Sequence, residues 1–254
     1  MKLFSRIYGE GDPLIIIHGL FGMSDNWNTL GKKFSEHYNV HLIDLRNHGR
    51  SPHSDDFDYD VMCNDLHTYI NDNQLKEPIL IGHSLGGKVA MKFIFSFPEI
   101  IEKVIVVDIS PRRYNSTFFK EILGSLDSLD IEKFSTRQEV DQALALDYND
   151  KGIRSFILKN LYRREDQRFD WRFNIKTLLE KIENIQQADF IDGTCQVPTH
   201  FIRGENSNYI TIDDENLIRE HFSDHSIVTI ENAGHWVHAE NPEGFYKEAI
   251  RLLT

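Results

Sequence analysis

Residues 79–90 read ILIGHSLGGKVA, and this stretch decides the fold. Aliphatic residues typical of a buried strand stop at Gly82, and a helical pattern begins at Leu85. A strand that turns so sharply into a helix strains the backbone of its middle residue, and side chains two positions away on either side would collide. Gly82 and Gly86 avoid that collision. The pattern therefore predicts a nucleophile elbow, with Ser84 exposed at a helix N-terminus.

Strands and helices alternate on both sides of this stretch. Aliphatic runs predict strands at 13–17, 40–44, 79–81, 104–108, 197–203 and 226–230. Amphipathic stretches predict helices at 25–37, 59–74 and 85–97, and a last helix runs from an Asn241 N-cap to about Leu253. This alternation predicts an α/β fold, in which a mostly parallel sheet carries helices on both faces.

Helical periodicity replaces the strand pattern between residues 111 and 190. We expect an all-helical cap over 111–190, inserted into a sheet domain made of 1–110 and 191–254. Inserts placed at the carboxyl ends of parallel strands usually cover a binding crevice. The cap also holds a basic stretch, which either contacts a phosphate-bearing leaving group or is a solvated helix face: Arg154, Lys159, Arg163, Arg164, Arg168 and Arg172.

Composition excludes several classes of protein. The net charge of −12 argues against binding to nucleic acid or to anionic membranes, because both favour a basic surface. No apolar run is long enough to span a bilayer, and the N-terminal residues lack the apolar region of a signal peptide. Cys63 and Cys195 have no metal-ligand spacing, and we expect free thiols in a reducing cytoplasm and no metal or cofactor.

A nucleophilic serine needs a base and an acid that orients the base. His235 follows the last strand within Ala-Gly-His-Trp and is the predicted base, whereas its competitor His238 lacks a preceding glycine. For the acid we favour Asp108, which ends the strand after the serine, although a helix N-cap would also explain it. Ser207 occupies the position where many enzymes of this fold carry the acid, and Asp213 and Asp214 lie several residues later.

The turn HGLFG at 18–22 is the expected second part of an oxyanion hole. We expect the backbone N–H groups of Leu20 and Leu85 to be the donors, with Phe21 as the alternative to Leu20, and His18 to be structural. Further residues are candidates for a substrate pocket, although ordinary core packing explains the aromatic ones in the cap equally well: Phe21, His83, Tyr114, Phe118, Trp171 and Trp236.

Motifs along nearly the whole chain resemble the α/β-hydrolase superfamily, and more narrowly the YbfF-type esterases of bacteria and their mitochondrial relatives. They are HGLFG at 18–22, DLRNHGRSP at 44–52, GHSLGGK at 82–88, VDISP at 107–111, FIRGENSNYI at 201–210 and NAGHWVHAENP at 232–242. The resemblance implies that the cap and the acid follow the sixth strand, which agrees with Asp108 and explains Ser207.

The resemblance also implies a cytoplasmic serine hydrolase that cleaves small-molecule acyl esters, with acyl-coenzyme A thioesters as a further substrate class, and that works as a monomer or homodimer. Two rival functions stay open. A lyase of the same fold would use the serine and histidine for proton abstraction, but Ser207 argues against it. A non-catalytic ligand receptor would have no need for Ser84, Asp108 and His235 together.

Overall fold

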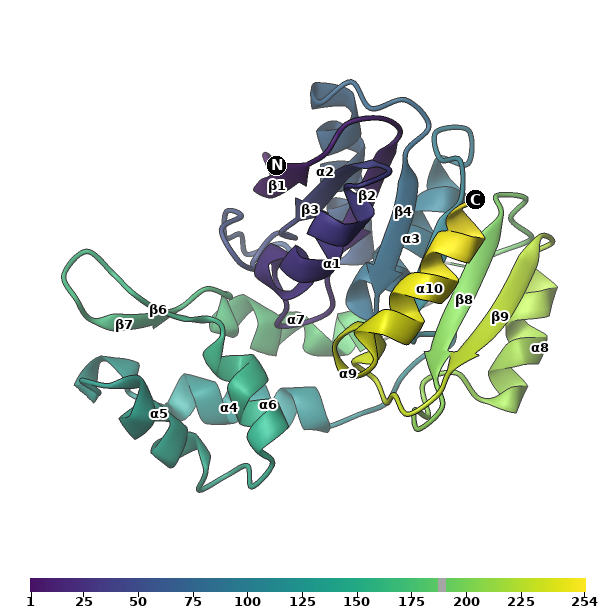
Figure 1. Ribbon diagram of the computed structural model, residues 1–254. Coiled ribbons are helices and arrows are strands. Elements are labelled where there is room, and N and C mark those ends of the chain that lie inside the picture. Colours follow the sequence, from purple (N-terminus) through teal and green to yellow (C-terminus); the bar gives the residue numbers. More distant parts are fainter. Residues whose placement is uncertain (187–190) are drawn as a thin grey trace.

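A seven-stranded sheet forms the centre of the molecule (Figure 1). The computed structural model describes residues 1–186 and 191–254. The strands lie in the order β1-β3-β2-β4-β5-β8-β9, and every neighbouring pair is parallel except β1 and β3. Their bounds are β1 Ser5–Tyr8, β2 Pro13–Ile17, β3 Asn39–Ile43, β4 Ile79–His83, β5 Val104–Val107, β8 Thr199–Gly204 and β9 His225–Ile230.

Alternate side chains of the strands pack into separate apolar cores on the two faces of the sheet. Ile15 and Val106 belong to the core that includes α2 (Tyr59–Asp72), α3 (Leu85–Ser96) and α8 (Ile212–His221). Ile16 and Ile105 belong to the core that includes α1 (Asn28–Phe34) and α10 (Pro242–Leu253). Because both faces are covered, the central strands read as continuous aliphatic runs, and the predicted α/β architecture is confirmed.

Two of the elements had no clear signal in the sequence. The edge strand β1 pairs with β3 alone and is at most half-buried, so its apolar alternation is weak. Helix α8 buries little more than Asp214 and Ile218 on its inner side, which leaves almost no apolar periodicity to detect. Two short helical segments, η1 (Ser24–Trp27) and α9 (Val237–Glu240), complete the sheet domain.

The inserted segment lies beyond the carboxyl ends of the strands (Figure 1). We call residues 111–186 of the described chain the cap; the expected boundary at residue 190 lies outside the described residues. The cap follows β5, the fifth strand along this chain, not a sixth. Its elements are α4 (Phe118–Ser128), η2 (Ile131–Lys133), α5 (Arg137–Leu144), α6 (Lys151–Leu158), β6 (Leu161–Arg163), β7 (Phe169–Trp171) and α7 (Ile175–Gln186).

The prediction that this cap is all-helical was wrong at residues 161–171. Strands β6 and β7 pair antiparallel, with Leu161 opposite Trp171. The turn between them contains Gln167 in the left-handed region, at a φ of 67°, and Arg164 N–H donates to the carbonyl of Arg168 at 2.9 Å. Each of these strands has only three residues, and charged residues in the turn separate them. An alternation of apolar residues this short does not predict a hairpin from the sequence.

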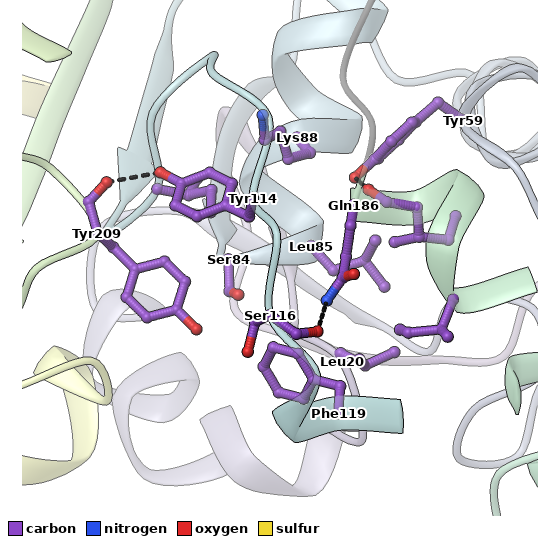
Figure 2. Close-up of a pocket in the computed structure, with 13 residues that line it drawn as sticks. Leu20, Tyr59, Ser84, Leu85, Lys88, Tyr114, Ser116, Phe119, Gln186 and Tyr209 are labelled. Carbon is purple, nitrogen blue, oxygen red and sulfur yellow. Dashed lines mark hydrogen bonds between the residues drawn. The ribbon is translucent and has the colours of Figure 1, made fainter. Parts of the chain in front are cut away.

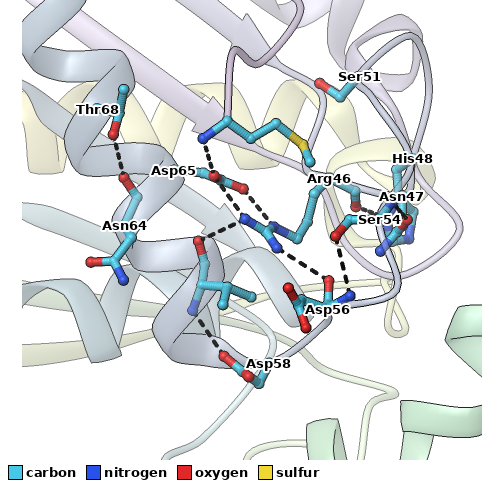
Figure 3. A network of polar contacts seen from close by, with 12 residues as sticks. Arg46, Asn47, His48, Ser51, Ser54, Asp56, Asp58, Asn64, Asp65 and Thr68 are labelled. Carbon is cyan, nitrogen blue, oxygen red and sulfur yellow. Dashed lines mark hydrogen bonds and ion pairs between the residues drawn. The ribbon is translucent and has the colours of Figure 1, made fainter.

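A buried ion pair fixes the loop that follows β3 (Figure 3). The Arg46 guanidinium donates to both carboxylate oxygens of Asp65 on α2, at 2.6 and 2.9 Å, and also to the carbonyl of Asp56. Asp44 at the start of the loop accepts the N–H groups of Ser24 and Arg50. The loop therefore lies in a fixed position beside the turn at residues 18–22.

Candidate active site

Ser84 lies at a sharp turn between β4 and α3, with φ 52° and ψ −114°. A Cβ atom on Gly82 would lie 2.4 Å from the carbonyl oxygen of Gly86, and a Cβ on Gly86 would lie 2.4 Å from that of Ile17. Both neighbours are backbone atoms that have no room to move. The elbow therefore requires glycine at both positions and carries backbone strain at the serine itself.

Ser84, His235 and Asp108 form one chain of hydrogen bonds. Ser84 follows β4, Asp108 follows β5, and His235 lies between β9 and α9. His235 Nε2 lies 3.1 Å from Ser84 Oγ, and its Nδ1 lies 2.7 Å from Asp108 Oδ2. The Asp108 carboxylate is fully buried, whereas Ser84 is 8% exposed and the His235 side chain 19% exposed. In this arrangement the imidazole can take the serine proton, and the buried carboxylate can stabilise the imidazolium that forms.

The end of β8 and the loop after it also hold the Asp108 carboxylate. Gly204 N–H donates to Oδ1 at 3.0 Å, and the Ser207 hydroxyl donates to Oδ2 at 2.5 Å. The Ser207 oxygen accepts in turn from Tyr209 N–H at 3.2 Å. Asp108 itself has a φ of 50°, which directs its side chain toward this loop. Ser207 thus contacts the acid without replacing it, a role that the sequence alone did not predict.

The alternative acids lie away from this chain of contacts. Asp214 caps the start of α8 by accepting from Thr211, and it also pairs with Ser110 and Arg112. Asp213 points from the exposed side of the same helix. Among the described residues, Asp108 is therefore the carboxylate in contact with His235.

Two aromatic neighbours position the His235 ring. Tyr209 stacks on it at a centroid distance of 3.8 Å and an interplanar angle of 16°. His83 Nε2 lies 2.8 Å from the backbone carbonyl of His235, so this nitrogen carries the proton and donates it. Burial lowers the pKa of His83 well below its usual value, which keeps its ring neutral. His83 was predicted as a pocket residue, and the structure also places it under the backbone of the candidate base.

The turn at 18–22 faces the elbow and is fixed by His18. The buried His18 ring donates from Nδ1 to the carbonyl of Gly19 at 2.7 Å and accepts Leu45 N–H at Nε2. A Cβ on Gly19 would lie 2.8 Å from His83 Nδ1, which shows how closely the turn approaches the elbow. Leu85 is the first residue of α3, so its N–H has no acceptor within the helix and points toward the site.

Three cavities meet at Tyr209, and each of them is lined by Ser84, His235 or both. The inner cavity, of about 70 Å³, is largely apolar (Figure 2), and its described lining is Leu20, Tyr59, Ser84, Leu85, Lys88, Ile109, Tyr114, Ser116, Phe119, Ile182, Ile185, Gln186 and Tyr209. The aromatic cavity, of about 200 Å³, is lined by Leu20, His83, Ser84, Phe118, Phe119, Phe156, Tyr209, His235 and Trp236. The polar cavity, of about 370 Å³, is lined by Arg112, Tyr114, Asn115, Ser116, Asn206, Ser207, Asn208, Tyr209 and His235.

The candidate pocket residues separate into two groups. Tyr114 lines the inner cavity, and His83, Phe118 and Trp236 line the aromatic one. The remaining two lie elsewhere, since neither is among the described residues that line the three cavities. Phe21 is buried, and its carbonyl accepts from Asn160 of the cap at 2.8 Å. Trp171 stacks on Phe173 beside the cap hairpin, which is the core packing that the sequence left open as an alternative.

The side chains of four of the six residues of the basic stretch make polar contacts within the cap. Arg164 and Arg168 both pair with Glu132, and Arg154 pairs with Asp141 at 2.7 Å. Arg163 donates to backbone carbonyls. These contacts match a role in holding the cap together and leave little of the stretch to receive a phosphate group.

Comparison with known proteins agrees with the fold. Residues 12–242 match the model of a family described as the alpha/beta hydrolase fold. The chain belongs to this α/β-hydrolase family. A solved structure titled "Marine microorganism esterase" is 41% identical, with a TM-score of 0.96 and 99% of each chain covered.

Two relatives of this chain are named as an esterase and a lipase. Esterase YbfF of Escherichia coli is 31% identical, with 96% of this chain and 94% of the relative covered. The sn-1-specific diacylglycerol lipase ABHD11 of Danio rerio is 34% identical, with 96% and 79% covered. In line with these α/β-hydrolases, the chain is a serine ester hydrolase. Within the described part of the chain, we find no helix both long and apolar enough to cross a membrane.

Proposed function

We propose that Ser84, His235 and Asp108 are the catalytic nucleophile, base and acid of a carboxylesterase. The observation that carries this proposal is the continuous chain of contacts from Ser84 Oγ through the His235 ring to Asp108, at 3.1 and 2.7 Å. In the first step His235 Nε2 takes the Ser84 proton, and the serine oxygen attacks the ester carbonyl. The backbone N–H groups of Leu20 and Leu85 stabilise the resulting oxyanion.

The acyl-enzyme then forms and is cleaved by the same groups. His235 returns its proton to the leaving alcohol, and the C–O bond to that alcohol breaks. A water molecule next gives a proton to His235 and attacks the acyl-serine carbonyl. His235 returns this proton to Ser84 Oγ as the bond between the acyl carbon and Oγ breaks, which releases the carboxylic acid and regenerates Ser84. Asp108 holds the imidazole in place and stabilises its charged form.

We propose acyl esters as the main substrates and thioesters of coenzyme A as a side activity at most. Three arginines of the basic stretch that would recognise phosphate groups are paired with Glu132 or Asp141. Two buried free thiols, Cys63 and Cys195, support a location in the reducing cytoplasm. The site is complete within one chain, so a monomer or a homodimer would serve equally well.

Steady-state kinetics on p-nitrophenyl butanoate tests the assignment. We expect Ser84→Ala and Asp108→Asn each to lower kcat by about 10⁴-fold, with KM changed far less. Asp213→Asn is the matched control, because that carboxylate lies on the exposed side of α8. Full activity in folded Ser84→Ala, or a wild-type protein inert on every acyl ester, would overturn the proposal.

A further inference from the structure

The two sides of Ser84 differ in size and chemistry. The inner cavity, about 70 Å³, begins at Ser84 and Leu85, and His235 is absent from its described lining. The aromatic cavity, about 200 Å³, begins at the same serine and includes His235. Besides Ser84, three described residues line both cavities and so lie where the two spaces meet: Leu20, Phe119 and Tyr209. A substrate ester bound at Ser84 would have to divide its two ends between these spaces.

The chemistry decides which end enters which cavity. The leaving alcohol must accept a proton from His235 Nε2, so it has to lie on the side of the site that contains His235. The acyl chain points away from the leaving oxygen and so enters the space beside Leu85. We infer that the inner cavity is the acyl site and the aromatic cavity is the leaving-group site, so the enzyme favours esters of short acyl groups with larger, apolar or aromatic alcohols. This inference rests on the proposed catalytic roles.

The size of the inner cavity limits the acyl group. A cavity of about 150 Å³ holds one benzene molecule, so a space about half as large accommodates a chain of about two to four carbons. Ile182, almost fully buried, forms part of its wall together with Ile109 and Ile185. Branched side chains of this kind have restricted rotamers, so the wall yields little to a longer chain.

The aromatic cavity offers apolar surface that internal packing has not used. Phe156 on α6 lies with its ring centroid 5.3 Å from that of Trp236, and both side chains are only half-buried. Phe118 on α4 remains 38% exposed. One wall therefore comes from the cap and the other from the loop before α9. An aryl or alkyl alcohol packed against the exposed faces of Phe156 and Trp236 would bury these faces.

A matrix of substrates tests the two assignments separately. Acyl length is varied in p-nitrophenyl acetate, butanoate and octanoate, and the alcohol is varied in ethyl acetate and 2-phenylethyl acetate, whose leaving alcohols have similar basicity. For the wild type we expect kcat/KM for butanoate to exceed that for octanoate by at least about 10-fold, and 2-phenylethyl acetate to exceed ethyl acetate by a similar factor.

Matched variants link each preference to one cavity. Ile182→Ala should raise the octanoate-to-butanoate ratio by about 10-fold and leave the alcohol ratio unchanged, and Ile182→Val should act in the same direction if the alanine variant does not fold. Phe156→Ala should lower the 2-phenylethyl-to-ethyl ratio by about 10-fold and leave the acyl ratio unchanged. Leu146→Ala, at a cap residue that is 87% exposed, should change neither ratio.

The outcomes separate this inference from the proposed function. A wild type that prefers octanoate, or an Ile182→Ala variant that alters the alcohol ratio instead, overturns the cavity assignment and leaves the esterase activity in place, provided that Ser84→Ala abolishes the rates. Failure of the wild type to hydrolyse any of these esters would overturn the proposed function and the inference with it.

Discussion

Ser207 contacts the candidate acid at the same carboxylate oxygen that His235 uses. Its hydroxyl donates to Asp108 Oδ2 at 2.5 Å, and its oxygen is held by Tyr209 N–H. A hydrogen bond to a charged group contributes about 1.5–3 kcal/mol, and here it also fixes the angle at which Asp108 meets the imidazole. Ser207 is therefore a positioning residue for the acid, although its place in the sequence gave no sign of a contact.

Removal of this hydroxyl should slow catalysis more than it affects folding. We expect Ser207→Ala to lower kcat by about 10-fold with little change in KM, because the acid keeps Gly204 N–H but loses its second donor. Ser207→Thr retains a hydroxyl and should recover most of the rate. Equal rates for wild type and Ser207→Ala on p-nitrophenyl butanoate would contradict the role.

The glycine at position 86 gives a second prediction about a single residue. Its Cβ would lie 2.4 Å from the carbonyl oxygen of Ile17 and 2.7 Å from that of His18. We expect Gly86→Ala to move β2 and α3 apart, with a loss of several kcal/mol in the free energy of unfolding measured in urea. Gly124→Ala is the control, because nothing lies within 4 Å of a Cβ there and alanine favours a helix. Unchanged stability in Gly86→Ala would contradict this account of the elbow.

At the scale of elements, one buried ion pair joins the loop after β3 to helix α2. The Asp65 side chain is 1% exposed and accepts two hydrogen bonds from Arg46 (Figure 3). Loss of the carboxylate would leave a buried guanidinium without its countercharge. The loop also supplies Leu45 N–H to His18, so the ion pair supports the turn beside the elbow.

Substitution of Asp65 should therefore lower the stability of the protein. We expect Asp65→Ala to lower the free energy of unfolding by about 3–5 kcal/mol in urea titration. Asp60→Ala on the same helix is the control, since its carboxylate is 78% exposed and pairs with Lys92 at the surface, where loss costs about 1 kcal/mol or less. If both variants lost a similar free energy of unfolding, burial of the Arg46–Asp65 pair would not add to its contribution to stability.

At the scale of the whole molecule, several histidines are buried in neutral form around the active site. Burial lowers the pKa of His18 from 6.5 to about 4 and the pKa values of His48 and His238 to about 3. Two of the rings have little polar support. His238 stacks on Trp27 at 4.0 Å, and its Nδ1 has no hydrogen-bond partner among the described residues. His48 Nε2 likewise has no hydrogen-bond partner in the part of the chain that the structure describes.

Stability should consequently fall on acidification. The unfolded chain binds protons at these histidines below about pH 6.5, whereas the folded protein does not until its lowered pKa values are reached. The full contribution of these histidines to stability is therefore present above pH 6.5. As the pH falls from 6.5 toward 4, each of them lowers the free energy of unfolding by about 1 kcal/mol per pH unit. Urea titrations across this range give the slope.

A variant assigns part of that slope to one group. His238→Leu should reduce it by about 1 kcal/mol per pH unit, because one proton fewer binds on unfolding. A wild-type stability that does not change between pH 7 and pH 4.5 would contradict the account.

The sequence by itself determined the sheet core and the positions of the three catalytic candidates. Buried parallel strands leave continuous aliphatic runs, and a strained elbow leaves glycines around Ser84, so both are written locally along the chain. The same local logic gave the Asn241 N-cap and the last helix, which begins at Pro242. Family resemblance and strand order then favoured Asp108 over Asp213 and Asp214 as the acid.

Tertiary structure alone decided what each side chain meets across the fold. Ser207 reaches Asp108, and His83 reaches the carbonyl of His235, over separations of 99 and 152 residues. The hairpin in the cap and the burial of Trp171 depend on long-range packing for the same reason. The size of each cavity beside Ser84 arises from the cap folding over the strand ends, because contacts between distant segments leave no periodic trace in the sequence.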